Sequence, residues 1–438
     1  MTLTPMQLDA AQAFRREKNL VLLSPTGTGK TLAYMLPLVE ELKRQPEEQA
    51  MVVVPSRELA MQTVGVCKGT GSGVRCVALY GGRPAMEEHR RMREMNPQLI
   101  VGTPGRLLDH LGQGNIDGNK IHILIIDEFD KGLEMGFRRE MSNLFAQLPH
   151  VGRRMLLSAT DKEEMTQLMP EYHLLNYLAT DEPQERLKEY FVQSPSKDKL
   201  ETLGQLLCQL GQETSIVFVG YRESVERVAK YLKGQGFYLS MLHGGMEQRD
   251  RERQLFRFLS GSTNILVSTD LASRGLDIDH LDNVIHYHLP QTDDIRTHRN
   301  GRTARWDKEG RVLYIVGPEE DSKTLLSPSG REQNVRPFDG FEPGNVTASR
   351  STGEGLGVTP YWQTLYIGKG KKDKLSRGDI MGFLCKQGGL SREDVGRIDV
   401  MDHQSYAAIN RERVGETLLR LRGQKIKGLR TIFEVIRD

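Results

Sequence analysis

Residues 20–42 form the segment LVLLSPTGTGKTLAYMLPLVEEL, from which the class of fold can be inferred. It opens with four consecutive apolar residues at 20–23, a run typical of a strand buried on both faces of a parallel sheet. A glycine-containing loop follows at 24–31, and an amphipathic segment of helical length comes next. A strand, a loop and a helix in this order predict one unit of an open α/β sheet.

The loop of this unit carries a phosphate-binding pattern. Gly27 and Gly29 allow the backbone to bend so that amide N–H groups face an anion, and the start of the helix adds positive potential. Lys30 can then reach the β- and γ-phosphates of a nucleotide, and the Thr31 hydroxyl can ligate Mg²⁺. Ser24 stands where the strict pattern has glycine. The alternative is a glycine turn with an incidental lysine.

A second candidate motif follows the apolar run ILII at 123–126. Asp127 lies where α/β sheets bind ligands, at the carboxyl end of a predicted strand, and can hold Mg²⁺ through water. Glu128 is placed to orient or deprotonate an attacking water. Taken alone, the run DEFD at 127–130 is equally a solvated acidic loop. The phosphate-binding pattern earlier in the chain favours nucleotide hydrolysis.

Further apolar runs extend the pattern into two domains. In the first half they occupy residues 51–54, 99–101 and 155–157, with amphipathic segments between most of them. After a polar stretch at 181–186 a second series occupies residues 216–219, 239–242, 265–267, 284–287 and 312–316. The sequence therefore predicts two α/β parallel-sheet domains of similar size, at 1–182 and 187–318.

The last part of the chain differs in composition. Residues 319–360 have few large apolar side chains and many Gly, Ser, Pro and Thr, which predicts a flexible linker. Residues 361–438 predict strand, helix, two strands, helix and strand, the order of the ferredoxin-like α+β fold. RNA-binding domains of the RRM type use this order, and so do many unrelated modules.

The charge is unevenly distributed. The whole chain of 438 residues has a formal net charge of only +2. Residues 361–438 contain 16 Lys and Arg against 10 Asp and Glu, a net charge of +6, and the remainder is therefore net negative. A basic module suggests a polyanionic partner such as nucleic acid. An ordinary lysine-rich surface is the other interpretation.

Composition places the chain in a broad class. Hydrophobic residues make up 38% and charged residues 27%, enough apolar material for sizeable cores. No segment approaches the roughly 20 apolar residues that span a bilayer, and the start MTLTPMQLDA lacks a secretory pattern. The four cysteines are scattered, so neither a disulfide framework nor a zinc site is expected. We expect a cytoplasmic protein without a membrane partner.

Taken in order, the motifs resemble those of the DEAD-box RNA helicases of superfamily 2. The matching segments of the first domain are 3–7 (LTPMQ), 24–31, 55–62 (PSRELAMQ), Gly81-Gly82, 103–106 (TPGR), 127–130 and 158–160 (SAT). Those of the second domain are 243–251 (HGGMEQRDR), 268–277 (STDLASRGLD) and 298–305 (HRNGRTAR). The resemblance covers nearly all of residues 1–318 and implies two tandem RecA-like domains.

The resemblance implies ATP and Mg²⁺ as cofactors and assigns roles to residues at the nucleotide. The implied catalytic residues are Lys30, Asp127, Glu128, Arg302 and Arg305. The implied ATP-binding residues are Gln7, Thr26, Gly27, Thr28, Gly29, Lys30, Thr31, Gly275 and Asp277, with Mg²⁺ held by Thr31 and Asp127. Gln7 is implied to read the adenine edge. Arg302 and Arg305 are three residues apart, which predicts that they share one face of a helical turn. The resemblance implies that they act as arginine fingers.

The resemblance also implies an RNA path over both domains. The residues implied at the RNA backbone are Arg57, Gly82, Thr103, Arg106, Arg251 and Thr269, and such contacts carry little sequence preference. The residues implied to couple the ATP site to RNA are Asp130, Ser158, Thr160 and His298. ATP binding is implied to bend the RNA strand and separate a duplex locally.

Several positions depart from the family pattern, among them Phe129, Ala304, His288, Arg296 and Thr297. Phe129 replaces the alanine of the family's name motif, and Ala304 stands where glycine is usual. These changes motivate an alternative function, an ATP-gated RNA clamp that hydrolyses ATP very slowly. A DNA helicase is a further alternative.

Residues 364–438 resemble the RNA-binding domain of the DbpA-type bacterial helicases. The likeness rests on segments such as 365–384 (LYIGKGKKDKLSRGDIMGFL) and 425–437 (KIKGLRTIFEVIR). It implies contact with structured RNA, notably ribosomal RNA, through a basic cluster that includes Lys371 and Lys372. A protein-binding ferredoxin-like module is the alternative. The sequence as a whole thus predicts a monomeric ATP-dependent RNA helicase acting in assembly of the large ribosomal subunit.

Overall fold

The computed structural model describes residues 3–25, 27–81, 85–178, 187–273, 278, 281–303, 309–320, 335–341 and 356–436. Contacts divide the chain into two units, residues 1–184 with 274–279, and residues 185–273 with 280–438. In the described part of the chain, none of the helices combines the length and apolar composition of a membrane-spanning segment.

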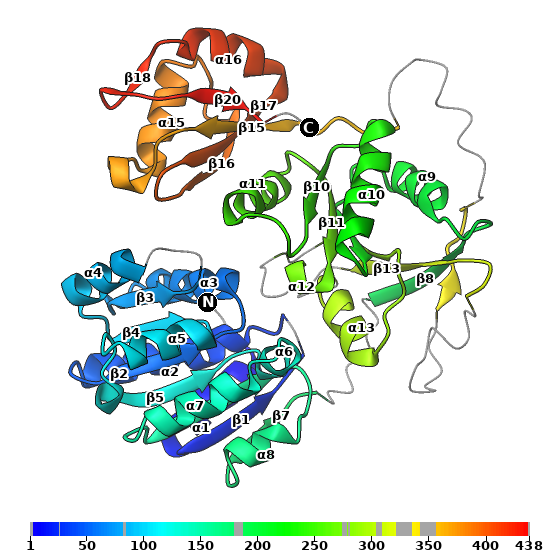
Figure 1. The fold of residues 1–438 in the computed structure, drawn as a ribbon. Helices are drawn as coiled ribbons and strands as arrows, with labels where there is room; N and C mark the ends of the chain where they lie inside the picture. The colour runs from blue at the N-terminus through cyan, green and yellow to red at the C-terminus, as the bar shows by residue number, and fades with distance from the viewer. Residues whose placement is uncertain are drawn as a thin grey trace. The chain divides into compact units, whose positions relative to one another are not determined.

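The first unit is built on one sheet, whose described strands are all parallel and follow the order β3-β4-β2-β5-β6-β1-β7 (Figure 1). Its strands are β1 (Asn19–Leu23), β2 (Gln49–Val53), β3 (Cys76–Leu79), β4 (Leu99–Gly102), β5 (Ile121–Ile126), β6 (Arg153–Ser158) and β7 (His173–Asn176). Its helices are α1 (Pro5–Arg16), α2 (Lys30–Arg44), α3 (Arg57–Gly69), α4 (Ala85–Met95), α5 (Pro104–Gly112), α6 (Phe129–Glu134), α7 (Arg138–Gln147) and α8 (Glu164–Leu168), with a 3-10 turn at Gly118–Lys120.

Helices cover both faces of this sheet, as expected for buried parallel strands. Alternate residues of each strand enter opposite cores, so that Leu22 packs with α1, α2 and α3 and Val21 packs with α5 to α8. This double burial explains why the strands read as continuous apolar runs in the sequence. All carboxyl ends of the strands meet at one edge, where the loops gather.

The second unit begins with another sheet whose described strands are all parallel, in the order β10-β11-β9-β12-β13-β8-β14. Its strands are β8 (Leu187–Gln193), β9 (Ser215–Val219), β10 (Leu239–Leu242), β11 (Ile265–Thr269), β12 (Asn283–His286), β13 (Gly310–Val316) and β14 (Arg336–Pro337). Its helices are α9 (Leu200–Leu210), α10 (Arg222–Gly234), α11 (Gln248–Leu259), α12 (Asp270–Ser273) and α13 (Asp293–Asn300).

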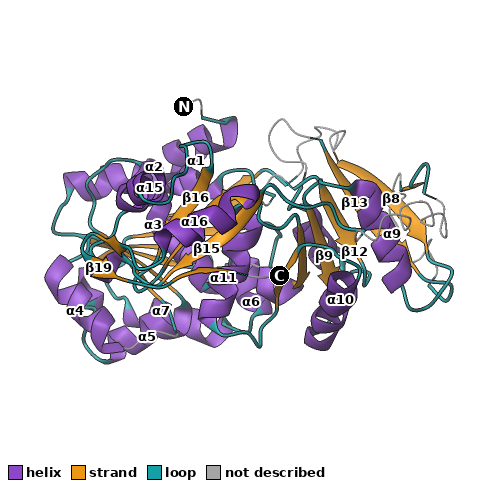
Figure 2. Ribbon diagram, turned by 90° about the horizontal axis from the view of Figure 1, so that it is seen from above, coloured by secondary structure: helices purple, strands orange, loops and turns teal. Residues whose placement is uncertain are grey.

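The two faces of this second sheet differ in chemistry. One face packs on α9 and α10 in an apolar core, and Figure 2 shows α10 beside β9 and β12. The opposite face carries buried polar groups, with the rings of His286 and Tyr314 stacked at a centroid separation of 4.4 Å. The second domain therefore has one apolar core layer and one layer in which buried polar groups lie among apolar residues such as Ile216 and Val284.

Part of the predicted linker has a defined place in the structure. Residues 335–341 add strand β14 to the edge of the sheet beside β8, and Phe338 and Phe341 pack against the apolar core of the domain. Phe338 meets Tyr190 edge to face, with ring centroids 5.4 Å apart. The other described residues of the predicted linker are 319–320 and 356–360, where Leu356 packs on the same core. The domain and linker boundaries stay predictions.

The C-terminal domain has a four-stranded antiparallel sheet in the order β16-β17-β15-β20, which is the ferredoxin-like arrangement. Its elements are β15 (Trp362–Ile367), a 3-10 turn (Lys371–Asp373), α15 (Arg377–Lys386), β16 (Val395–Val400), β17 (Ser405–Asn410), a 3-10 turn (Arg411–Arg413), α16 (Val414–Leu421), the hairpin β18 (Lys425–Ile426) and β19 (Leu429–Arg430), and β20 (Phe433–Val435). Leu365 and Ile367 point into the core beneath α15 and α16.

The other face of this small sheet meets α11 within the same unit. Tyr406 stacks on Phe256 with ring centroids 5.4 Å apart, and Arg249 donates a hydrogen bond of 2.8 Å to the Tyr366 hydroxyl. The hydroxyls of Thr364 and Ser262 lie 2.8 Å apart. Two aromatic side chains of the sheet are therefore engaged with a helix of the second domain.

The predicted fold class, two tandem RecA-like parallel-sheet domains and a small ferredoxin-like α+β domain, is confirmed. The apolar runs in the sequence do not predict strands β3, β7 and β8. β7 and β8 have partly exposed residues, and β3 is short with a cysteine at its start, so none of them presents a long apolar run. The hairpin β18–β19 consists of two-residue strands, too short for a periodicity to be read.

Candidate active site and RNA interface

The phosphate-binding loop has the geometry that its glycines predict. Gly27 and Gly29 both adopt left-handed φ angles, 83° and 85°, and Gly29 precedes the first residue of α2. The Lys30 ammonium donates to the carbonyl oxygens of Ser24 and Pro25 at 2.5 and 2.8 Å. The loop thus curls around the lysine at the positive end of a fifteen-residue helix, an arrangement suited to phosphate.

Ser24, which replaces the first glycine of the pattern, has a structural part in the loop. Its hydroxyl lies 2.7 Å from that of Thr28, which also donates to the Pro25 carbonyl at 3.0 Å. These bonds cross the loop and fix its curvature. A serine at this position is therefore compatible with the phosphate-binding conformation.

Asp127 and Thr31 face each other across the carboxyl edge of the sheet. The Thr31 hydroxyl lies 3.5 Å from Asp127 Oδ2, which also accepts a hydrogen bond of 3.1 Å from the Tyr34 hydroxyl. Burial raises the pKa of Asp127 to about 6, an increase to which the charge of Glu128 adds. Burial likewise lowers the pKa of Lys30 to about 8, although Asp127 opposes the change. The hydroxyl and carboxylate oxygens are the hard ligands that Mg²⁺ takes, so the residues present fit this ion.

Glu128 is held in an unusual backbone conformation. Its φ and ψ angles are 52° and 49°, left-handed values that cost free energy for a residue with a side chain. Its carboxylate accepts a hydrogen bond of 2.5 Å from the ammonium group of Lys131, a residue that is buried on α6. Phe129 next to it is fully buried in the apolar core below the sheet edge. The larger side chain at 129 is thus accommodated, and both acidic residues stay at the edge.

Three of the four predicted coupling residues lie together. Asp130 Oδ2 accepts hydrogen bonds from the Thr160 hydroxyl at 3.1 Å and from the Ala159 amide at 3.2 Å. The Ser158 hydroxyl donates to the Thr160 carbonyl at 2.6 Å. The segment after β6 is therefore tied directly to the acidic motif. His298, the fourth residue, is buried on α13 of the second unit.

Gln7 connects the start of α1 to the phosphate-binding loop. Its side-chain amide accepts from the Thr4 amide at 3.0 Å and donates to the Gly29 carbonyl at 3.2 Å. A Cβ atom on Gly29 would lie 2.4 Å from the Gln7 nitrogen, so glycine is required there for both its φ angle and its space. The Gln7 side-chain amide retains one more N–H donor and further acceptor capacity on its oxygen. These are enough to form hydrogen bonds with the edge of a base.

The RNA candidates of the first unit follow neighbouring strands. Arg57 begins α3 after β2, and Thr103 precedes α5 after β4, strands that pair in register from Ala50–Leu99 to Val53–Gly102. Arg106 lies one turn into α5 and donates to Glu88 at 2.7 Å and to Asp109 at 3.1 Å. Gly82, the remaining candidate of this unit, lies outside the described residues.

Glu88 anchors Arg106 from a buried position. Its Oε2 atom also accepts a hydrogen bond of 3.0 Å from His110 Nε2. Burial opposes ionisation of Glu88, but the bonds from His110 and Arg106 outweigh this effect and hold its pKa below the usual range. The carboxylate is thus a fixed counter-charge for Arg106, and sequence reasoning missed it.

In the second unit, Thr269 ends β11 and Arg251 donates from α11 to the Ala272 carbonyl at 3.2 Å. The next residue after Thr269, Asp270, forms a two-pronged ion pair with Arg299 at 2.6 and 2.8 Å. Arg299 also donates to His286 Nδ1 at 3.1 Å, so the segments of the predicted RNA and ATP motifs share one hydrogen-bond network. Sequence reasoning missed the ion pair between Asp270 and Arg299. Two residues in distant motifs have no characteristic spacing along the chain that would indicate their contact.

The prediction that Arg302 and Arg305 share one face of a helical turn stays a prediction, because only Arg302 lies among the described residues. Helix α13 ends at Asn300, Gly301 follows it, and Thr303 forms an isolated parallel bridge with Leu281. Arg302 is a buried residue just after the helix, in a turn where its amide donates to the Arg299 carbonyl at 3.1 Å. Arg305, Thr26, Gly275 and Asp277 lie outside the described residues.

Lys371 and Lys372 form an exposed turn in the C-terminal domain. Their backbone amides donate to the carbonyls of Met401 and Asp402 at 2.7 and 2.9 Å, so the turn is pinned to the end of β16. The turn leads through Lys374 into α15, which begins at Arg377. The predicted basic cluster therefore lies at one end of the sheet.

A phosphate-binding loop, an acidic pair and a second parallel-sheet domain define the class of a nucleotide-hydrolysing protein with two RecA-like domains. Family models match three parts of the chain: DEAD/DEAH box helicase at residues 4–168, helicase conserved C-terminal domain at 198–307, and DbpA RNA binding domain at 364–435.

Curated relatives extend over nearly the whole chain. The ATP-dependent RNA helicase DbpA of Escherichia coli K12 is 31% identical over 435 residues, which cover 98% of this chain and 93% of that protein. The DbpA helicase of Bacillus subtilis 168 is 28% identical, with 97% and 93% covered. A solved structure of S. cerevisiae Dbp5 bound to RNA and ADP BeF3 is 25% identical, with a TM-score of 0.65 and 77% of this chain and 94% of that chain covered.

The chain belongs to the DEAD-box family of ATP-dependent RNA helicases, and it is an enzyme that couples ATP hydrolysis to RNA binding. Its third domain is of the DbpA RNA-binding type, so RNA is its partner. Its nucleotide is ATP, the nucleotide of this helicase family.

Proposed function

We propose that this helicase separates short RNA duplexes locally as ATP binding brings its two RecA-like domains together. The observation that carries the proposal is the joint placement of Lys30, Thr31, Asp127 and Glu128 at one sheet edge. The roles of Arg302 and Arg305 as arginine fingers, and of Gln7 at adenine, are part of it. RNA held along its backbone needs no particular sequence.

The proposed chemistry assigns one task to each group. Lys30 and the loop amides bind the phosphates, and Glu128 orients the attacking water and takes its proton, with its carboxylate positioned by the fixed backbone and by Lys131. Mg²⁺ would be held by Thr31 and Asp127 and would neutralise phosphate charge. Arg302 and Arg305 complete the site on closure.

The proposal is tested by steady-state ATP hydrolysis with single-stranded RNA, duplex RNA and single-stranded DNA. We expect stimulation by RNA and none by DNA, and loss of the stimulated rate in Lys30→Ala. Equal stimulation by DNA would contradict RNA selectivity. Single-turnover cleavage separates a helicase from the slow ATP-gated clamp, because the clamp predicts tight RNA binding with almost no phosphate release.

We further propose that the C-terminal domain tethers the catalytic domains to structured ribosomal RNA during large-subunit assembly, as a monomer in the cytoplasm. The net charge of +6 in residues 361–438 and the DbpA-type match support this target. Crosslinking in cells followed by sequencing of bound RNA identifies the target directly. Removal of residues 361–438 should weaken binding to ribosomal hairpins while basal ATP hydrolysis remains; unchanged hairpin affinity would favour a protein-binding module.

A further inference from the structure

We propose that Glu189, Tyr314 and Asn300 are positioning residues for Arg302, the arginine proposed to act in ATP hydrolysis. They belong to a set of hydrogen-bonded side chains inside the second domain, here called the β8 network, whose members are Glu189, Tyr314, Asn300, His286, Arg299 and Asp270. This role rests on the proposed function of Arg302 and adds the groups that hold that residue in place. Glu189 and Tyr314 lie on β8 and β13, outside the motifs that carry the family resemblance.

Four side chains form the first part of the β8 network. Glu189 Oε2 accepts a hydrogen bond of 2.7 Å from the Tyr314 hydroxyl. The oxygen of this hydroxyl accepts one of 3.2 Å from Asn300 Nδ2. Asn300 Oδ1 and His286 Nε2 are 2.9 Å apart. These bonds join strand β8 to strand β13, to the last residue of α13 and to strand β12.

Arg299 extends the network toward the predicted RNA contacts of the same domain. It donates to His286 Nδ1 at 3.1 Å and twice to the Asp270 carboxylate, at 2.6 and 2.8 Å. Asp270 follows Thr269, the candidate RNA residue that ends β11. One series of hydrogen bonds therefore reaches from β8 to the residue beside a proposed RNA contact.

The chemistry of the groups fixes the direction of every bond. An arginine can only donate, so His286 Nδ1 is the acceptor and Nε2 carries the hydrogen. Asn300 must then turn its oxygen to His286 and its NH2 group to Tyr314. The phenolic hydrogen of Tyr314 is left for Glu189, and burial together with the charge of Glu189 raises the pKa of Tyr314, so the phenol keeps it. A network with a single arrangement of its hydrogens holds its side chains in one geometry.

Ring and ion contacts make this arrangement rigid. The rings of His286 and Tyr314 stack with centroids 4.4 Å apart and planes 19° apart. The Arg296 guanidinium lies 5.2 Å from the centroid of the Tyr314 ring and donates to Glu189 at 2.5 Å. The side chains of Arg296 and Glu189 are only 4% and 15% exposed, so salt and water screen their attraction little.

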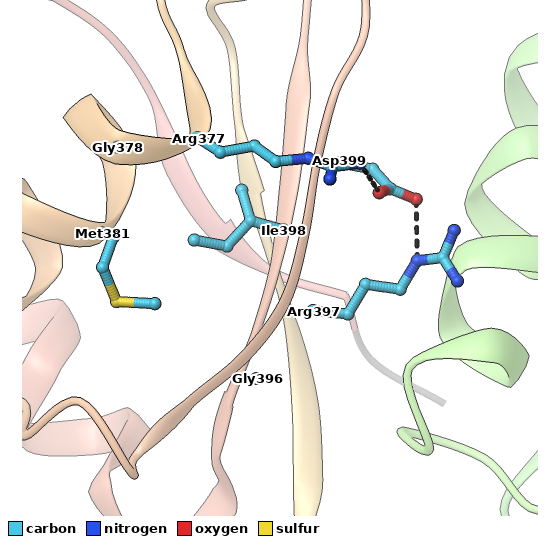
Figure 3. A pocket seen from close by; sticks show the side chains of 7 residues that line it. All are labelled: Arg377, Gly378, Met381, Gly396, Arg397, Ile398 and Asp399. Carbon is cyan, nitrogen blue, oxygen red and sulfur yellow. Dashed lines mark hydrogen bonds and ion pairs between the residues drawn. The ribbon is translucent and has the colours of Figure 1, made fainter. Parts of the chain in front are cut away.

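A surface ion pair of the C-terminal domain offers a contrast. Asp399 accepts hydrogen bonds from Arg377 at 3.2 Å and from Arg397 at 2.9 Å (Figure 3). These two arginine side chains are 74% and 43% exposed, and exposed pairs do little to hold a structure. In the buried β8 network, loss of one member leaves its neighbours without a partner that water could replace. Those neighbours then have to move.

The β8 network also fixes the backbone from which Arg302 extends. The Arg302 amide donates to the Arg299 carbonyl at 3.1 Å, and the Thr303 amide donates to the Asn300 carbonyl at 3.1 Å. The Thr303 hydroxyl is hydrogen-bonded to the Leu281 carbonyl. Both residues whose carbonyls accept these amide bonds have their side chains in the network. A shift of Arg299 or Asn300 would therefore displace Arg302 as well.

The test measures single-turnover cleavage of ATP by the full-length chain in the presence of a single-stranded RNA oligonucleotide. Tyr314→Phe removes the hydroxyl between Asn300 and Glu189 and keeps the ring. We expect the cleavage rate to fall by about tenfold to hundredfold, because small displacements of a catalytic group have effects of this size. Equilibrium affinities for ATP and for the RNA should stay within about twofold of the parent values, since the hydroxyl binds neither ligand.

Tyr190→Phe is the matched control. It removes a hydroxyl from the residue next to Glu189 on β8, outside the network, and should keep the parent rate. Asn300→Ala breaks the network at two bonds and provides the same test if Tyr314→Phe does not fold. Circular dichroism melting checks the fold of each variant.

Combination with Arg302→Ala shows whether the network acts through Arg302. If it does, Tyr314→Phe slows cleavage no further in the Arg302→Ala background, because the residue being positioned is already absent. A merely structural role predicts that Tyr314→Phe slows both backgrounds by the same factor. That result would overturn the positioning role.

The outcomes also separate the positioning role from the proposed function. If Arg302→Ala slows cleavage and Tyr314→Phe does not, the positioning role is wrong and the function of Arg302 stands. If Arg302→Ala keeps the parent rate, the proposed function of Arg302 fails and the positioning role fails with it.

Discussion

Glu128 has a strained backbone conformation and carries a carboxylate that is proposed to act in catalysis. Its left-handed backbone follows directly on the last strand residues of β5, and the turn brings its carboxylate to Lys131 one helical turn later. Such a conformation persists only when the surroundings fix it, here the buried Phe129 and the bond from the Glu128 amide to Asp127 at 2.9 Å. The acidic motif is thus oriented before any substrate arrives.

Glu128→Gln should lower RNA-stimulated ATP hydrolysis by about 10²- to 10⁴-fold, because an amide cannot accept the proton of water. ATP binding, followed with a fluorescent analogue, should persist, since the phosphate-binding loop is unchanged. Glu134→Gln, an exposed change on the same helix, is the control and should keep the parent rate. Parent-level turnover in Glu128→Gln would refute the assigned chemistry.

His286 is a second residue whose surroundings fix its chemical state. Its Nε2 faces the Asn300 side-chain oxygen at 2.9 Å, and its Nδ1 faces Arg299, which can only donate. The neutral ring with hydrogen on Nε2 satisfies both bonds. Burial holds the pKa of His286 well below its usual range, and the charges of Arg299 and Arg296 add to the effect.

This state predicts a pH dependence of stability. As the pH falls below about 6.5, the unfolded chain takes up a proton at His286 and the folded chain does not, so stability is lost with acidification. Urea unfolding of the parent followed by circular dichroism should show this loss between neutral pH and the acid range. His286→Gln should be less stable at pH 8 but show a smaller decline. An identical decline in both proteins would exclude His286 as its source.

At the scale of elements, both parallel sheets bring residues from distant motifs to one edge. In the first unit the phosphate-binding loop follows β1, the acidic motif follows β5 and the Ser158 segment follows β6. These strands are neighbours in the order β5-β6-β1, so residues far apart in sequence come within hydrogen-bond distance. Strand β14 is a different kind of addition, since it extends the second sheet from a segment poor in apolar residues.

Phe338→Ala tests whether β14 stabilises the second domain. Phe338 is half-buried and meets Tyr190 edge to face, so its removal should cost about 2 kcal/mol, roughly half of a fully buried phenylalanine. Chemical denaturation measures this change. Asp339→Ala, an exposed neighbour, should change stability little. No loss in Phe338→Ala would mean that the segment contributes nothing to the domain.

In the molecule as a whole, the groups proposed as catalytic are divided between two units. Lys30, Asp127 and Glu128 belong to the first, and Arg302 belongs to the second. A division of this kind makes hydrolysis depend on domain closure, and RNA that favours closure then stimulates the rate.

Arg302→Ala should therefore reduce RNA-stimulated hydrolysis by about 10³-fold or more while ATP affinity falls much less. Equilibrium binding and single-turnover cleavage measure the two effects separately. Arg227→Ala removes an exposed arginine of the same unit and serves as the control. A proportional loss of ATP affinity and rate would assign Arg302 to nucleotide binding rather than to the transition state.

The class of fold, the family and the placement of the phosphate loop and acidic motif could be predicted from the amino-acid sequence, because these depend on local periodicity and on ordered motifs. The sequence could not determine strands β7 and β14, which are defined by pairing rather than by apolar runs.

Which side chains contact one another became known from the folded arrangement of the elements. The pairs Arg106–Glu88 and Arg299–Asp270 join segments 18 and 29 residues apart, and the oriented arginines at Asp399 join a helix to an edge strand. The bridge of Thr303 to Leu281 likewise joins residues 22 positions apart that no local pattern connects. Long-range hydrogen bonds and ion pairs depend on distances in space, and spacing along the chain does not encode them.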